Sequence, residues 1–142
     1  MSLLASTPRI AGVDVGTKRV GLALSDPLHV FARVHGTYAP DDALDALAAV
    51  HASDGLEAVV VGWPLTEDGE EGEAVAFAQA YLKRIAEALP GVECIKQDER
   101  YTSEWAKDAL RRAGVKQPGR YDKGRVDAAA AAVILQLYLD AQ

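Results

Sequence analysis

The sequence has only one cysteine and no long apolar run, and each of these two features excludes a class of protein. Cys94 stands alone, so an intramolecular disulfide is impossible, which is typical of proteins in the reducing cytoplasm. We expect Cys94 to be a small buried side chain in a strand. No uninterrupted apolar stretch of about 18 residues is present, so no transmembrane helix is predicted. The first residues lack a positive region and a long apolar one and do not resemble a signal peptide. We therefore expect a cytoplasmic protein without a membrane partner.

The chain also has no cluster of histidines or cysteines that would suit zinc. His29, His35 and His51 are scattered along the sequence, and we assign them no catalytic role. Core or surface positions explain them adequately.

The length of 142 residues fits a single domain over residues 1–142, and an apolar content of 49% can bury a core. A net charge of −6 argues mildly against nucleic acid as a partner. The distribution of charge matters more, because residues 111–125 contain one acid, Asp122, and six cations. These are Arg111, Arg112, Lys116, Arg120, Lys123 and Arg125. This basic stretch runs directly into Asp127.

Hydrophobic patterning predicts an α/β protein with the order β-β-β-α-β-α-β-α-α. The predicted strands span residues 9–16, 20–25, 30–38, 56–61 and 92–98. The predicted helices start near 41, 75, 102 and 124 and end near 55, 89, 113 and 140. Asp41 is a plausible N-cap of the first helix. Three hairpin-connected strands followed by two crossover strands predict one mixed five-stranded sheet with helices on both faces.

Three separated carboxylates stand where a charge is out of place. Asp14 interrupts an apolar strand, Glu99 ends the last predicted strand, and Asp127 opens an apolar helix. A charge among apolar residues costs several kcal/mol unless something compensates it. The carboxyl ends of parallel strands share one edge of a sheet, and the small residues after Asp127 let its helix approach closely. A divalent cation between the three would remove their repulsion and supply metal-assisted phosphodiester hydrolysis.

Each carboxylate also has a simpler explanation. Asp14 could form a turn before Gly16, and Glu99 could pair with Arg100 on a solvated loop. Asp127 could interact with the dipole of its helix. The three explanations are reasonable singly but require a coincidence together.

Four segments resemble the YqgF/RuvX family, in the right order and over nearly the whole chain. They are residues 13–26 (VDVGTKRVGLALSD), 60–72 (VVGWPLTEDGEEG), 98–103 (DERYTS) and 127–140 (DAAAAAVILQLYLD). The resemblance implies an RNase H-like fold and a small cytoplasmic nuclease. Family members are described as candidate Holliday-junction resolvases and as nucleases that mature the 5′ end of the small-subunit ribosomal RNA precursor. Departures at Val15, Trp63, Tyr101 and Ser103 leave the carboxylates intact and bear on substrate preference.

For a nuclease of this kind we expect Asp14, Glu99 and Asp127 to be catalytic and to bind Mg²⁺ or Mn²⁺, with two ions roughly 4 Å apart when substrate is present. Asp98 is the rival of Glu99 as second ligand. The expected contacts to substrate phosphates are Lys18, Arg19, Arg100, Thr102, Lys123 and Arg125. Such contacts position a strand without reading its sequence.

Other features remain open at this stage. The acidic loop 67–73 is interpreted as solvated surface, with substrate gating as an alternative. Trp63 and Trp105 are expected in the core, although either could stack on a base.

Two rival functions also remain. The segment Val13–Thr17 resembles the phosphate loop of actin-like ATPases and sugar kinases, but those proteins need two such domains. A non-catalytic RNA-binding module is the second rival. The sequence does not choose between RNA and branched DNA, and the protein could be a monomer or a homodimer; cleavage of a four-way junction would require a homodimer.

Overall fold

The computed structural model of the protein describes residues 7–100 and 123–142. Its strands and helices follow the predicted order within these ranges. They are β1 (Arg9–Val15), β2 (Val20–Ser25), β3 (Ala32–Tyr38), α1 (Pro40–Ser53), β4 (Leu56–Trp63), α2 (Glu73–Ala88), β5 (Glu93–Asp98) and α4 (Lys123–Asp140). The helix predicted from residue 102 to 113 lies outside the described residues.

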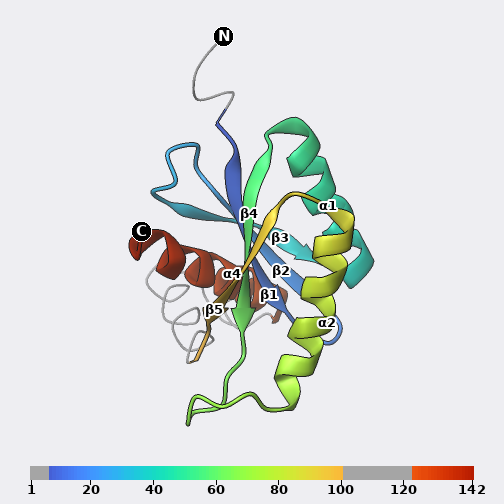
Figure 1. The fold of residues 1–142 in the computed structure, drawn as a ribbon, viewed down its shortest axis with the longest axis vertical. Helices are drawn as coiled ribbons and strands as arrows, with labels where there is room; N and C mark the ends of the chain where they lie inside the picture. The colour runs from blue at the N-terminus through green and yellow to red at the C-terminus, as the bar shows by residue number, and fades with distance from the viewer. Residues whose placement is uncertain (1–6, 101–122) are drawn as a thin grey trace.

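The strands form one five-stranded sheet in the order β3-β2-β1-β4-β5. β1 pairs antiparallel with β2 and parallel with β4, and β4 pairs parallel with β5. The mixed sheet predicted from the sequence is therefore confirmed. Because β1, β4 and β5 run in the same direction, their carboxyl ends lie at one edge of the sheet, the lower end in Figure 1.

Helices cover both faces of this sheet. α1 and α2 lie on one side and α4 on the other (Figure 1). β4 shows why both faces of the sheet must be covered, because it has apolar side chains on each. Val59 and Val61 belong to the core under α1 and α2, whereas Ala58 and Val60 belong to the core under α4. A strand buried on both faces is a nearly continuous apolar run, as the sequence predicted.

α4 packs unusually close to the sheet. A Cβ atom at Gly12 of β1 would lie only 2.7 Å from the carbonyl oxygen of Ala131 and from the Cβ of Leu135. Glycine at this position therefore sets the distance between the helix and the central strand. No helix in the described part of the chain is long and apolar enough to cross a membrane.

Two local predictions were wrong. α1 begins at Pro40 with Ala39 as its N-cap, so Asp41 lies in the first turn and does not cap the helix. Proline is favoured at the first helical position because its fixed φ suits the helix and its missing N–H has no partner there. Cys94 is half-buried beside the core under α1 and α2, not fully buried. This burial still raises the pKa of its thiol.

Candidate active site

Two of the three carboxylates are in direct contact at the carboxyl edge of the sheet. Asp14 is the penultimate residue of β1, and Glu99 directly follows β5. Their side chains share a hydrogen bond, although β4 lies between the two strands. The backbone N–H of Glu99 donates to the carbonyl oxygen of Trp63 at 3.2 Å, which holds Glu99 against the end of β4.

A glycine in β4 makes room for this contact. A Cβ atom at Gly62 would lie 2.7 Å from Oε2 of Glu99 and 2.5 Å from Cδ1 of Ile134. Any larger residue at position 62 would therefore push the Glu99 carboxyl group or α4 away.

The contact keeps a proton between the two acids. The pKa of Glu99 is raised to about 9, mainly by its partial burial and then by the nearby charge of Asp14, their hydrogen bond and the charge of Asp98. The pKa of Asp14 is raised to about 6, because its partial burial and the charge of Asp127 outweigh the hydrogen bond from Glu99, which lowers it. Glu99 thus stays protonated and donates a hydrogen bond to the Asp14 carboxylate, which accepts it. Two half-buried carboxyl groups that share a hydrogen bond do not both carry a charge unless a cation compensates them.

Asp127 reaches the same neighbourhood from α4. A Cβ atom at Gly21 of β2 would lie 2.1 Å from the backbone oxygen of Asp127, so the helix rests directly on that glycine. Gly21 is the partner of Asp14 in the β1–β2 ladder. The Asp127 side chain is only 15% exposed, and its Oδ2 lies 3.5 Å from Nε of Arg19 in an ion pair.

The three carboxylates do not surround a preformed metal cavity. Within residues 7–100 and 123–142, no group of three His, Cys, Asp or Glu side chains is arranged to hold an ion. The pairings explain this arrangement. Asp14 and Glu99 face each other across their shared proton, and Asp127 faces Arg19. The donor set still suits a hard divalent cation, because all three side chains are half-buried and offer carboxyl oxygens, the ligands that such a cation prefers.

Asp98 has a different partner from Glu99. The guanidinium of Arg100 donates to Asp98 through Nε at 2.9 Å and Nη2 at 2.6 Å, and the Arg100 backbone N–H donates to it at 3.0 Å. The hydrogen bond from Arg100 lowers the pKa of Asp98. Arg100 therefore pairs with Asp98, while the next carboxylate along the chain, Glu99, faces Asp14.

The residues expected to contact phosphate fall into three groups. Lys18 is exposed and Arg19 half-exposed on the turn between β1 and β2, at the end of β1 that holds Asp14. Arg100 lies at the end of β5, where it also donates to the carbonyl oxygen of Glu67 at 3.4 Å. Thr102 and the side chains of Lys123 and Arg125 lie outside the described residues.

Trp63 belongs to the core, as predicted. It is 4% exposed and packs against Val75 and Ala78 of α2. Its indole N–H donates to Oε2 of Glu71 at 2.9 Å, and the ammonium of Lys96 lies 4.4 Å from the ring centroid. These contacts exclude stacking on a base by Trp63, whereas Trp105 lies outside the described residues.

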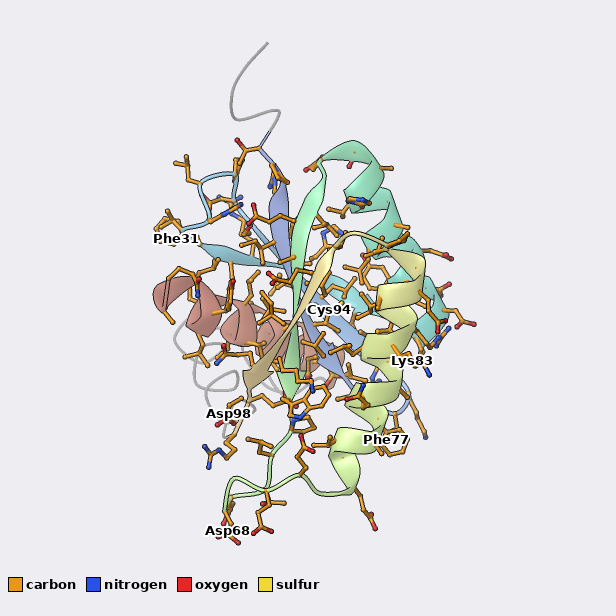
Figure 2. The ribbon with its side chains drawn as sticks, viewed as in Figure 1. Phe31, Asp68, Phe77, Lys83, Cys94 and Asp98 are labelled. Carbon is orange, nitrogen blue, oxygen red and sulfur yellow. The ribbon has the colours of Figure 1, made fainter. Side chains whose placement is uncertain are left out.

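The acidic loop after β4 is exposed, also as predicted. A backbone bridge between Leu65 and Glu71 closes it into a tight turn with Gly69 at a φ of +82°. Figure 2 shows Asp68 on this loop at the same end of the molecule as Asp98.

The histidines serve structural purposes where their contacts are defined. Nδ1 of His51 accepts a hydrogen bond from the backbone N–H of Leu56 at 2.9 Å. His29 contacts the carbonyl oxygen of Pro8 at 2.7 Å. Pro8 directly precedes β1 and Leu56 begins β4, so both contacts lie at the end of the sheet away from the carboxylates.

Sequence reasoning missed Gly21 and Gly62, on which the positions of Asp127 and Glu99 depend. Each interrupts an otherwise apolar strand, and an isolated strand glycine is a recognised signal of close approach by another group.

The comparisons with known proteins agree with this architecture. The family model described as "RuvX: Holliday junction resolvase" matches residues 8–141. The chain belongs to the RuvX family. This confirms the resemblance seen in its four sequence segments.

Two relatives carry the name "Putative pre-16S rRNA nuclease". The protein from Salinibacter ruber is 64% identical, and the match covers 99% of this chain and 98% of the relative. The protein from Chlorobaculum tepidum is 40% identical, and the match covers 96% of each chain. Both relatives therefore match this RuvX chain over nearly its whole length.

Among solved structures, RuvC of Thermus thermophilus in complex with a Holliday junction substrate has the same fold as this RuvX chain. The TM-score is 0.58 at 20% identity, and the match covers 94% of both chains. The likeness confirms the predicted RNase H-like fold.

Proposed function

We propose that this protein is a divalent-metal-dependent nuclease that hydrolyses phosphodiester bonds near the 5′ end of the small-subunit ribosomal RNA precursor in the cytoplasm. The observation that carries the proposal is the half-buried, hydrogen-bonded pair of Asp14 and Glu99 at the carboxyl edge of the sheet. The names of the relatives from Salinibacter ruber and Chlorobaculum tepidum support the RNA substrate.

Asp14, Glu99 and Asp127 would hold the cation, Mg²⁺ or Mn²⁺. When bound, such ions would lower the pKa of a coordinated water and stabilise the negative charge that develops on the phosphoryl group and on the leaving oxygen. Glu99 must release its proton before it can serve as a ligand, since a protonated carboxyl group is a poor one.

The cationic side chains around the carboxylates would orient the RNA backbone. Lys18, Arg19 and Arg100 lie at the same edge of the sheet as Asp14 and Glu99. Asp98 and the carbonyl oxygen of Glu67 fix the guanidinium of Arg100, so this side chain loses little freedom when it contacts a phosphate. Such contacts supply affinity and register but no sequence preference.

A Holliday-junction resolvase is the second candidate, and the description of the family model favours it. A four-way junction needs two coordinated cuts, hence a homodimer with two sites. Sedimentation of the protein alone and with a four-way junction measures this directly, and a monomer in both conditions excludes junction resolution by a dimer.

The proposed function is tested with three substrates of matched length: a single-stranded RNA with the precursor's 5′ leader, duplex DNA, and a four-way DNA junction. Each is incubated with purified protein and Mn²⁺, with Asp14→Asn protein as the control. We expect the RNA to be cleaved by the wild type alone. Binding of RNA without cleavage by the wild type would instead support the non-catalytic RNA-binding module, and preferential cleavage of the junction would support the resolvase.

A further inference from the structure

Arg19 makes an incomplete ion pair at the edge of the candidate active site. Its Nε lies 3.5 Å from Oδ2 of Asp127, a distance that gives Coulomb attraction but no good hydrogen bond. In the described part of the chain this buried Nε has no hydrogen-bond partner. A buried donor without a partner costs free energy, so Nε of Arg19 faces Asp127 through charge attraction and not through a satisfied hydrogen bond.

The backbone of Arg19 is held by a hydrogen bond, although Nε of its side chain has no hydrogen-bond partner in the described part of the chain. The N–H of Gly16 donates to the carbonyl oxygen of Arg19 at 2.8 Å, and a Cβ atom at Gly16 would lie 2.7 Å from that oxygen. The turn therefore anchors Arg19 a short distance past Asp14 at the end of β1. With 42% of its side chain exposed, the guanidinium has room to turn toward solvent without any change in the fold.

We propose that Arg19 is the built-in counter-cation of this site: it neutralises Asp127 in the metal-free protein and moves to a substrate phosphate when a divalent cation takes its place. The inference rests on the proposed function. The Asp127 carboxylate cannot bind the Arg19 guanidinium and a divalent cation through the same oxygen atom. Arg19 and the metal therefore compete for Asp127, and each weakens the binding of the other.

A phosphate suits the released side chain better than Asp127 does. The planar fork of a guanidinium matches two oxygens of a phosphate, and charge-assisted bonds of this type are strong. The Nε–H that lacks a partner beside Asp127 would gain one. Arg19 would then couple metal binding to substrate binding, because the metal frees the donor that the RNA uses.

The competition is measured by calorimetric titration of the full chain with Mn²⁺ alone. Arg19→Gln removes the resident charge, so we expect Mn²⁺ to bind roughly threefold to tenfold more tightly than to the wild type. Arg19→Lys keeps a charge, so its affinity should stay close to that of the wild type. Lys18→Gln removes the same charge from the neighbouring exposed position and should change Mn²⁺ affinity less than Arg19→Gln does.

The second readout is binding of a short single-stranded RNA with Ca²⁺ in place of Mn²⁺. We expect both Arg19 variants to bind it about tenfold more weakly than the wild type, because glutamine has no charge and lysine has no fork. Opposite effects of Arg19→Gln on metal and on RNA are the signature of the proposal. A merely structural Arg19 would weaken both.

A measurement on the wild type makes the test independent of the folding of any variant. The Nε–H resonance of Arg19 should shift when Mg²⁺ is added without RNA, because the guanidinium leaves Asp127. An unchanged resonance in protein that binds Mg²⁺, or a Mn²⁺ affinity in Arg19→Gln equal to or below that of the wild type, overturns this inference alone. A wild type that binds no divalent cation overturns the proposed function, and this inference with it.

Discussion

The Oε2 atom of Glu99 lies only 2.7 Å from the point where a Cβ atom would stand at Gly62. The glycine of the middle strand thus leaves open the space through which a carboxyl group beyond β5 reaches Asp14 at the end of β1. β4 lies between β1, which carries Asp14, and β5, which precedes Glu99. The two acids therefore meet only while position 62 of β4 has no side chain to block the contact.

Gly62→Ala should therefore damage both stability and activity. Overpacking against Glu99 and Ile134 is expected to lower the free energy of unfolding by about 1–3 kcal/mol, measured by urea denaturation. Cleavage should fall because Glu99 is displaced from Asp14. Gly72→Ala is the matched control, since its Cβ would meet only the Cγ2 methyl of Thr66, at 3.2 Å. Equal unfolding energies for the two variants would contradict this account of Gly62.

Glu99→Gln and Asp98→Asn separate two adjacent acids that the sequence could not distinguish. We expect Glu99→Gln to reduce Mn²⁺-dependent cleavage by roughly 100-fold or more, the scale of losing one group that stabilises the transition state. Asp98→Asn should cost less, because Asp98 acts on Arg100 and not on Asp14. Single-turnover cleavage rates of both proteins at saturating RNA provide the measurement. A larger loss in Asp98→Asn would reverse the assignment.

The metal-free protein should become less stable as pH rises. The pKa of Asp14 is raised to about 6 and that of Glu99 to about 9, mainly by partial burial, so the folded state holds more protons than the unfolded state between about pH 4 and 9. This contribution to stability is fully present below about pH 4 and is lost as pH rises through these two pKa values. Thermal melting in EDTA should show Tm falling over this range.

Addition of Mg²⁺ should restore stability most at high pH, because the cation replaces the proton between the two acids. Glu99→Gln removes the titrating group, so its Tm in EDTA should vary less with pH. A wild-type Tm in EDTA that rises between pH 6 and 9 would show that the pair does not hold its proton in the folded state.

Trp63→Phe should affect folding and leave RNA affinity unchanged. The substitution removes the hydrogen bond to Glu71 and leaves a small void beside α2, which should cost about 1–2 kcal/mol of unfolding free energy. Urea denaturation and RNA binding by anisotropy test the two halves of the prediction. A stable variant with weakened RNA binding would mean that the indole contacts a base after all.

The sequence by itself determined the order of the elements and the mixed sheet. Runs such as Leu56–Val61 and the apolar face of Lys123–Asp140 leave few alternatives, because each must be buried against a partner surface. The sequence also placed Asp14 and Glu99 at the ends of strands that run in the same direction. Their presence at one edge of the sheet follows from topology alone.

Only the tertiary structure decided which charges face each other. Glu99 shares a hydrogen bond with Asp14, Asp98 accepts hydrogen bonds from Arg100, and Asp127 forms an ion pair with Arg19. Neighbouring residues such as Asp98 and Glu99 have the same chemistry, so their partners depend on strand register and on differences of a few ångströms. Those distances are set by helix and strand contacts at glycines far from each acid in the sequence, and no local pattern encodes them.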